Sequence, residues 1–382
     1  MDRSGLTIAL DPWVLARRFR KQGIYVYAQQ LFREFGRMAP KGEVSFCLFT
    51  TPGSSNDAAV IGAAQNFTLE RTALLKCSPV WRLAGASLAA RNRADLLFAP
   101  SATVVPCRIP VVSTIHDVTP VLMPSHPANV NAVQRFFLWR AALASRAIIT
   151  VSECSKKDLM NVYGIPEEKI SVVYLGCNRM FFNDAPADAQ KLSALKSKLG
   201  VRAPYIIHHG TIQQRKNLVR LVEAYRLMLT ENPFLDFDLV LAGAPGWGYE
   251  DVFRAAQKQG QRRVLFAGAL EDEELALLVK GASLAVIPSL YEGFCLPMLE
   301  CMACGTPTIA ANASCLPEIS GGVLKYFDPV SIEDMAVCMK QAIEDTQLRG
   351  ELTRRGKQRA GSFDWVRCAE ETLRVLQRAA VT

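Results

Sequence analysis

Two glutamates, separated by seven residues, mark the stretch of sequence with the clearest chemistry. Glu292 lies in a loop after the apolar run 284–288, and Glu300 lies about one turn inside a helix that we predict to begin near Pro297. Because helical side chains lean toward the N-terminus, Glu300 can reach back toward the loop that carries Glu292. Carboxylates accept hydrogen bonds from hydroxyls, and the amides at a helix start bind phosphate. Together these features fit a sugar nucleotide; solvated acids at a helix start are the alternative.

Two cations precede another predicted helix. The strand 205–209 leads into GTIQQRKN, in which Arg215 and Lys216 stand directly before Asn217. Asn217 is predicted to cap the following helix, which places both cations at its positive end. That placement is unfavourable unless an anion compensates the charge, and a diphosphate would do so. The alternative is a solvated basic face. The two histidines that end the strand are expected to be structural.

A further histidine stands where a strand ends. The predicted strand 111–115 runs directly into His116, and open α/β sheets bind ligands beyond the carboxyl ends of their strands. His116 is therefore a candidate for contact with substrate, although it could equally bond to the backbone. Gly23 follows the first predicted strand and opens a helical pattern over 24–37. Its backbone amide is a candidate for binding an anion.

Strands and helices alternate along the whole chain. The expected strands cover 6–10, 44–50, 66–69, 96–99, 111–115, 148–151, 170–175, 205–209, 237–242, 264–267, 284–288, 308–310 and 324–327. Helical patterns separate the strands of the second half, which is typical of a doubly wound parallel sheet. A chain of 382 residues suggests two domains, and we place them at 1–180 and 181–364, with a polar linker over about 176–189.

The composition argues against several classes of protein. Half of the residues are hydrophobic, no apolar run is long enough to span a bilayer, and the N-terminus lacks the pattern of a signal peptide. We therefore expect a cytoplasmic protein. Its eleven cysteines are expected to be reduced and packed in the core, Cys301 and Cys304 included, although their spacing also suggests a zinc or redox site. We expect neither a metal nor another cofactor.

Positive charge is concentrated in the first half of the chain. Residues 1–200 carry 24 Lys and Arg against 14 Asp and Glu, whereas residues 201–382 carry 20 against 22, and residues 17–21 form a basic loop. The first half is thus expected to meet an anion. No basic–aromatic motif of a nucleic-acid fold is present, so lipid headgroups or a lipid-linked pyrophosphate fit better. A solvated basic surface is the alternative. Phe136, Phe137 and Trp139, on a predicted helix, are expected in the core.

Several of these motifs resemble one known family. The segment YEGFCLPMLECMACGTP resembles the E-x7-E segment of family 4 glycosyltransferases, retaining enzymes of the GT-B fold, although Cys295 stands where the family usually has glycine. GTIQQRKN resembles the family's phosphate-binding segment, with Thr211 where some relatives carry a second arginine. TIHD resembles the segment whose histidine lies near the transferred sugar. The glycine loop at Gly23 is similar too, with Tyr25 replacing its second glycine.

The resemblance implies a GT-B architecture, an α/β fold with two Rossmann-like doubly wound domains facing across a cleft. The first domain would bind the acceptor and the second the donor, and a C-terminal helix over 365–382 would cross back to the first. In this architecture the residues expected to carry catalysis are His116, Glu292, Lys216 and Arg215. Those expected to bind the donor are Gly23, Thr211, Leu270, Gly293, Phe294, Cys295, Leu296 and Glu300.

The expected reaction is transfer of a hexose from a nucleotide diphosphate to a hydroxyl, with retained configuration. The closest similarity is to mannosyltransferases of bacterial O-antigen or exopolysaccharide assembly, so GDP-mannose is the first expected donor and a UDP-hexose the second. The acceptor would be a glycan or a lipid-linked glycan, reached through peripheral contact of the basic first domain with the inner face of the cytoplasmic membrane. A non-catalytic sugar-nucleotide binding protein and an epimerase of the same fold are the other hypotheses.

Overall fold

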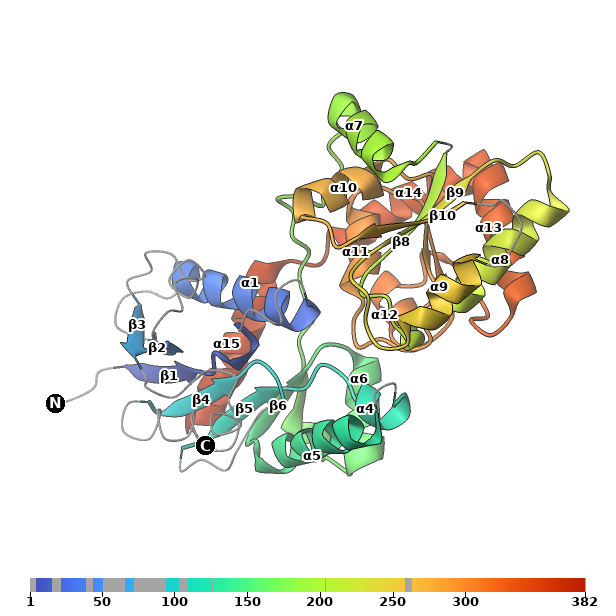
Figure 1. The fold of residues 1–382 in the computed structure, drawn as a ribbon. Coiled ribbons are helices and arrows are strands. Elements are labelled where there is room, and N and C mark those ends of the chain that lie inside the picture. The colour runs from blue at the N-terminus through green and yellow to red at the C-terminus, as the bar shows by residue number, and fades with distance from the viewer. Residues whose placement is uncertain are drawn as a thin grey trace. The chain divides into compact units, whose positions relative to one another are not determined.

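The computed structural model describes residues 5–15, 22–38, 44–50, 66–71, 94–102, 109–124, 127–202, 204–257 and 263–381. The basic loop predicted at 17–21 lies outside the described residues. The chain divides into two compact units (Figure 1). Unit 1 comprises residues 1–176 and 364–382, and unit 2 comprises residues 177–363.

Unit 1 contains a seven-stranded parallel sheet. Its strands are β1 (Leu6–Leu10), β2 (Val44–Thr50), β3 (Phe67–Arg71), β4 (Leu96–Ala99), β5 (Val111–Thr114), β6 (Ala147–Thr150) and β7 (Ile170–Val172). Their order in the sheet is β3-β2-β1-β4-β5-β6-β7, so the direction of winding reverses between β1 and β4. The strands β4 and β5 are buried throughout, which agrees with the continuous apolar sequence of β4, whereas β5 also buries Ser113 and Thr114.

Helices flank the sheet of unit 1 (Figure 1). They are η1 (Trp13–Leu15), α1 (Gly23–Met38), α4 (Thr119–Leu122), α5 (Ala128–Ala144), α6 (Glu153–Tyr163), η4 (Glu167–Lys169) and the C-terminal α15 (Trp365–Val381). As predicted, the C-terminal helix returns to the first unit, where α15 packs on α1 and on strands β4 to β6. Gly176 makes this return possible, because a Cβ there would lie 2.3 Å from the backbone nitrogen of Trp365.

Unit 2 contains a six-stranded parallel sheet. Its strands are β8 (Tyr205–His209), β9 (Asp238–Ala242), β10 (Val264–Gly268), β11 (Leu284–Ile287), β12 (Thr308–Ala311) and β13 (Lys325–Phe327), in the order β10-β9-β8-β11-β12-β13. The accompanying helices are α7 (Ala189–Leu199), η5 (Gln214–Lys216), α8 (Leu218–Glu231), α9 (Tyr249–Gln257), α10 (Asp272–Lys280), α11 (Leu296–Ala303), α12 (Leu316–Ser320), α13 (Ile332–Glu344) and α14 (Thr346–Ala360).

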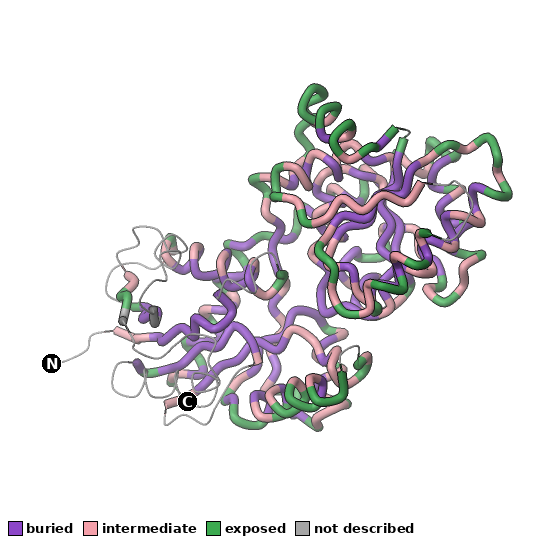
Figure 2. Tube along the Cα trace, in the orientation of Figure 1, coloured by how far each residue is buried: buried purple, intermediate pink, exposed green. Residues whose placement is uncertain are grey.

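In each unit the sheet forms the centre, and Figure 2 shows most of its strands as buried. Every strand expected from the sequence is present within a few residues of its predicted bounds. The nine cysteines in the described part of the chain are free thiols, and Cys301 is buried. No helix among the described residues is both long and apolar enough to cross a membrane.

Two predictions about local structure are wrong. Asn217 occupies the N-cap position of α8, but it adopts a left-handed conformation (φ 59°) and its side chain caps nothing. The side-chain amide of Asn217 instead donates to the backbone carbonyl of Pro329, 2.7 Å away. The aromatic residues of α5 were expected in the core, yet the side chains of Phe136 and Trp139 are 49% and 45% exposed. The inner face of α5 is already filled by Leu138 and two alanines, so these rings point outward.

Candidate active site

The predicted phosphate-binding segments of unit 2 meet at the point where its sheet reverses direction. Strand β8 pairs on one side with β9 and on the other with β11. Ligands of open α/β sheets bind beyond the carboxyl ends of the strands at such a switch point. The loops that follow β8 and β11 are joined there by a hydrogen bond of 2.9 Å from the amide of Leu290 to the carbonyl of Arg215. The topology therefore brings together two loops that lie far apart in the sequence.

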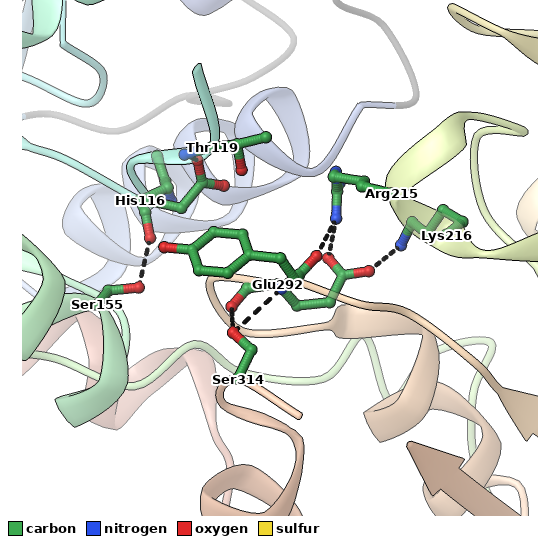
Figure 3. A network of polar contacts seen from close by, with 9 residues as sticks. His116, Thr119, Ser155, Arg215, Lys216, Glu292 and Ser314 are labelled. Atoms are coloured by element: carbon green, nitrogen blue, oxygen red, sulfur yellow. Dashed lines mark hydrogen bonds and ion pairs between the residues drawn. The ribbon is translucent and has the colours of Figure 1, made fainter. Parts of the chain in front are cut away.

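Glu292 accepts from both predicted cations (Figure 3). Its Oε1 lies 2.5 Å from Nζ of Lys216, and its Oε2 lies 2.5 Å from Nη1 of Arg215. Nη1 of Arg215 also donates to the carbonyl of Tyr291. All three charged side chains are buried or nearly so. From the sequence, a diphosphate was expected to offset the two cations. In this structure the protein's own Glu292 carboxylate does so.

The protonation state of Glu292 follows from these contacts. Burial alone would raise the pKa of its carboxyl, but the charges and hydrogen bonds of Arg215 and Lys216 outweigh burial and lower the pKa to about 2. Glu292 is therefore ionised at neutral pH. Its backbone is held by Ser314, whose hydroxyl donates to the Glu292 carbonyl at 2.6 Å and accepts from the Glu292 amide at 3.2 Å. Ser314 is a site residue that the sequence did not reveal.

The start of α11 lies beside the ammonium group of Lys216. A Cβ placed on Gly210, the residue after β8, would lie 3.6 Å from both Nζ of Lys216 and Cγ of Pro297. Pro297 lies in the first turn of α11, as predicted, and Cys295 is the N-cap, in a left-handed conformation (φ 72°). The backbone amides at this helix start belong to the predicted segment Gly293, Phe294, Cys295 and Leu296. Cation and helix start thus border the same space, an arrangement suited to an anion.

The side chains of that segment serve packing. Phe294 is buried and lies edge-on to Phe363, with ring centroids 5.6 Å apart. Cys295 is buried, and burial raises the pKa of its thiol to about 12, so the thiol stays protonated at neutral pH. Any role of these two residues in binding the donor would therefore fall to their backbone amides.

Glu300 lies on the first turns of α11 next to a buried histidine. Its Oε2 lies 3.6 Å from Nε2 of His209, which in turn is 3.1 Å from the carbonyl oxygen of Pro297. Since a carbonyl can only accept, His209 carries its proton on Nε2. Burial lowers the pKa of His209 to about 3, so its ring is neutral. Burial, with the nearby charge of Asp272, raises the pKa of Glu300 to about 8. Glu300 is consequently protonated in large part at neutral pH.

The loop after β9 braces the cation-bearing loop. The amide of Gly246 donates to the carbonyl of Ile212, and Gln214 donates to the carbonyl of Trp247. The two loops approach closely at Gly243, where a Cβ would lie 2.0 Å from the carbonyl oxygen of Gly210. Thr211 lies in the braced loop. Leu270 lies in the next loop along the sheet edge, between β10 and α10, and packs partly against the core. Their predicted contacts with the donor stay predictions.

In unit 1, His116 follows β5 and is partly buried against its neighbours. Its Nε2 lies 3.1 Å from the carbonyl oxygen of Pro100, which fixes the proton on Nε2 and leaves Nδ1 as the acceptor nitrogen. Burial lowers the pKa of His116, so the imidazole is neutral at neutral pH. The ring of Tyr27 meets it edge-on, with centroids 4.8 Å apart. The carbonyl of His116 accepts from the hydroxyl of Ser155 at 3.0 Å (Figure 3).

Tyr27 holds its own position through β5. Its hydroxyl lies 2.9 Å from Oγ1 of Thr114, and the tyrosine is almost fully buried. Tyr27 lies within the helical pattern predicted over 24–37, and its contact with His116 joins residues too far apart in sequence to be predicted from spacing. Gly23, the first residue of α1, is exposed at the start of that helix. Its predicted contact with the donor stays a prediction.

The site residues thus fall into two groups. Unit 2 brings Arg215, Lys216 and Glu292 into direct contact, with the start of α11 beside them. Unit 1 carries His116 and Gly23 after strands of its own sheet. Among the described residues, no cluster of three or more His, Cys, Asp or Glu side chains could hold a metal ion.

Comparison with known proteins agrees with this geometry. The family described as "Glycosyl transferases group 1" matches residues 193–359, and "Glycosyltransferase Family 4" matches residues 15–179. The O-antigen chain mannosyltransferase B of Escherichia coli is 30% identical over 69% of this chain and 68% of that protein. The serotype-specific mannosyltransferase WbdA of Escherichia coli is 28% identical over 71% of this chain. The match spans only 34% of that longer protein.

The fold is shared with solved structures. The crystal structure of HepE from Anabaena in complex with UDP-glucose superposes with a TM-score of 0.71, at 19% identity, over 97% of this chain and 99% of that one. Two parallel-sheet Rossmann-like units, with a C-terminal helix that returns to the first, are the GT-B arrangement. The chain is a glycosyltransferase, and it belongs to glycosyltransferase family 4 with the GT-B fold.

Proposed function

We propose that this glycosyltransferase moves mannose from GDP-mannose to a hydroxyl of a glycan or lipid-linked acceptor, with retained anomeric configuration. The observation that carries the donor site is the convergence of Arg215 and Lys216 on one carboxylate beside the start of α11. The choice of mannose is supported by the names of the E. coli relatives. Retention rests on the resemblance of the segment from Glu292 to Glu300 to the family's E-x7-E motif.

The cations would stabilise the leaving diphosphate. As the glycosidic bond breaks, negative charge develops on the diphosphate, and fixed donors aimed at that charge lower the barrier. Lys216 is buried, Arg215 is partly buried, and both are already in place, so little reorganisation is needed. Each hydrogen bond from a cation to a phosphate oxygen would contribute about 1.5–3 kcal/mol. The amides at the start of α11 would add further donors.

The carboxylates would bind hydroxyls. Glu292 is ionised and holds both cations, so an arriving diphosphate would compete for them and release the carboxylate toward the hydroxyls of the sugar. Glu300 lies further along the same helix, where it would bind the ribose. His116 would accept a hydrogen bond from the sugar through Nδ1, since its Nε2 is committed to the carbonyl of Pro100.

A panel of sugar nucleotides tests the proposal. The protein is incubated with GDP-mannose, UDP-glucose and UDP-galactose, with and without a glycan acceptor, and release of nucleoside diphosphate and the configuration of the product are measured. We expect turnover of GDP-mannose with an α-linked product. A β-linked product would exclude retention. A protein that binds nucleotides and releases no product from any donor would be a sensor, and release of an isomerised sugar would indicate an epimerase.

A UDP-hexose is the second candidate donor. The specific observation in its favour is that the GT-B structure of HepE contains UDP-glucose. The predicted contact with the base is made by the backbone at Leu270, which does not by itself select guanine over uracil. Faster turnover of UDP-glucose than of GDP-mannose in the same panel would favour this alternative.

We also propose that the reaction needs no metal ion, since two protein cations are available to stabilise the leaving group. Activity should survive treatment with EDTA. Loss of activity with EDTA and its recovery on addition of a divalent ion would overturn this part of the proposal.

The acceptor is proposed to be met at a membrane surface. Unit 1 carries 23 Lys and Arg against 15 Asp and Glu, whereas unit 2 carries 21 of each. An excess of positive charge in unit 1 suits a bilayer with anionic headgroups or a lipid-linked pyrophosphate. Peripheral association at the inner face of the cytoplasmic membrane follows as the proposed location.

A further inference from the structure

Helix α5 of unit 1 exposes an apolar surface. The side chains of Val133, Phe136, Trp139 and Leu143 are each between 45% and 54% exposed. We call these four side chains the α5 face. Among the described residues, no other helix exposes as many large apolar side chains. Single exposed apolar residues are normal on a protein surface, but a group of them on one helix marks an interaction site.

The α5 face is opposite the side of the helix that packs on the protein. The buried residues Leu138, Ala141 and Ala142 cover β5. At 3.6 residues per turn, the α5 face lies on the other side of the helix. The ring of Phe136 lies 6.2 Å from that of Trp139 and 5.6 Å from that of Phe137, so the aromatic side chains form one cluster. In Figure 2, α5 is coloured mainly as exposed or intermediate. A helix that is apolar on both sides needs a second apolar environment.

Positive charge accompanies the α5 face, and the segment that carries the face has no acidic residue. The helix carries Arg135 and Arg140, and Arg146 follows its end. By helical geometry, Arg135 lies along one border of the face and Arg140 lies between Phe136 and Val133, whereas Arg146 follows the end of the helix. The sequence contains no Asp or Glu from Val118 to Ser152, which includes the whole of α4 and α5. The surface therefore combines apolar side chains with arginines and carries no acidic residue of its own.

We propose that the α5 face docks on an anionic lipid bilayer, with α5 lying in the plane of the interface. Tryptophan, phenylalanine and leucine enter the boundary between headgroups and acyl chains, and flanking arginines bind anionic headgroups. The acid-free sequence removes the repulsion that carboxylates would meet there. This inference rests on the membrane location proposed above and adds the surface that makes the contact.

Binding to vesicles tests the inference. The full chain is sedimented with vesicles of phosphatidylcholine alone and of phosphatidylcholine mixed with phosphatidylglycerol. We expect binding to the mixed vesicles, reduced at least about tenfold by Phe136→Ser with Trp139→Ser, since burial of one such ring in an apolar environment is worth more than a factor of ten. Phe234→Ser is the matched control, because Phe234 is a fully exposed phenylalanine that belongs to unit 2, whereas α5 belongs to unit 1.

The charges are tested separately. Arg135→Gln with Arg146→Gln should weaken binding to the mixed vesicles and reduce its dependence on salt. Lys191→Gln with Lys198→Gln removes the same charge from exposed positions of α7 in unit 2 and should change little. Because this pair leaves the apolar side chains intact, it tests the inference even if the serine variant is unstable.

Several outcomes would overturn the inference. Vesicle binding that survives the loss of both rings, or that is lost equally in Phe234→Ser, would exclude the α5 face. A dimer in solution that the serine variant dissociates, without vesicle binding by the wild type, would show that the face receives a second copy of the chain. Retention on a glycan column in place of vesicles would indicate a sugar-binding surface. Affinity for GDP, measured on every variant, separates failure of this inference from failure of the proposed donor site.

Discussion

The two units are wound alike but distribute their charge differently. Each has a parallel sheet whose winding reverses beside a central strand, at β1 and β4 in unit 1 and at β8 and β11 in unit 2. Unit 2 has equal numbers of acidic and basic residues, yet it buries two cations against one carboxylate at its switch point. Unit 1 has the whole net charge of +8, and its partly buried His116 is neutral. The net charge of unit 1 is the basis of the proposed contact with an anionic surface, whereas the anion site proposed in unit 2 rests on local buried charge.

The largest expected effect tests whether the leaving group is bound in unit 2. Lys216→Ala should lower turnover at least about a hundredfold, the usual effect of removing one donor to a developing oxyanion. Turnover is measured with saturating donor, and thermal unfolding shows whether the variant is folded. Lys280→Ala, which removes a partly exposed lysine of α10, is the control and should retain activity.

The variant His116→Ala in unit 1 is compared with Lys216→Ala in unit 2, in both turnover and affinity for GDP. This variant should lose turnover while its affinity for GDP stays near that of the wild type, because His116 is proposed to meet the sugar. If His116→Ala weakened GDP binding as strongly as Lys216→Ala, the nucleotide could not be assigned to unit 2.

The next effect concerns the close approach of two loops in unit 2. Gly243→Ala should lower the free energy of unfolding by about 1–3 kcal/mol, since a Cβ there would lie 2.0 Å from the Gly210 carbonyl. Gly268→Ala shares the strain of a positive φ (69°) but meets no atom within 4 Å. Urea unfolding of both variants separates the cost of a positive φ from the cost of the steric clash between the Cβ at position 243 and the Gly210 carbonyl. Equal losses would mean that the loop approach contributes nothing.

A smaller effect tests the competition between Glu292 and a diphosphate. Glu292→Gln should tighten GDP binding by about tenfold, because neutralising the carboxylate frees two charge-assisted hydrogen bonds for phosphate. Turnover of the donor should fall at the same time, since the proposed contact with the sugar weakens. Calorimetric titration with GDP measures the first and product release the second. Weaker GDP binding would show that Glu292 supports the anion site instead of occupying it.

The smallest expected effect is a dependence of GDP affinity on pH, which we assign to Glu300 in unit 2 and not to His116 in unit 1. Burial raises the pKa of Glu300 to about 8, so binding of ribose hydroxyls to its carboxylate must first expel a proton. GDP affinity should then rise about fivefold from pH 7 to pH 8, as the charged fraction of this group grows. Glu300→Gln should abolish the rise. In unit 1, His116 has a lowered pKa and stays neutral over this range. A rise that persists in Glu300→Gln would assign the titration elsewhere.

Much of the fold follows from local sequence. Continuous apolar runs predicted the buried parallel strands, and Pro297 predicted the first turn of α11. These features depend on neighbours in the chain, so the sequence determines them directly.

Long-range contacts and facing directions could not be predicted in the same way. The acids and cations of unit 2 were each recognised, but their pairing joins Glu292 to a lysine 76 residues earlier. On α5, apolar residues occur on all sides, so periodicity does not tell which rings face inward. Asn217 was expected to cap α8 because asparagine favours that position, yet its amide makes a tertiary contact with Pro329.

A structure of the protein with bound GDP tests the central claim most directly. We predict that the two phosphates contact Lys216, Arg215 and the amides at the start of α11, that the Glu292 carboxylate has left at least one of the cations, and that the ribose lies against Glu300. A diphosphate bound at the switch point of unit 1, or one in unit 2 that leaves both cations paired with Glu292, would contradict the account.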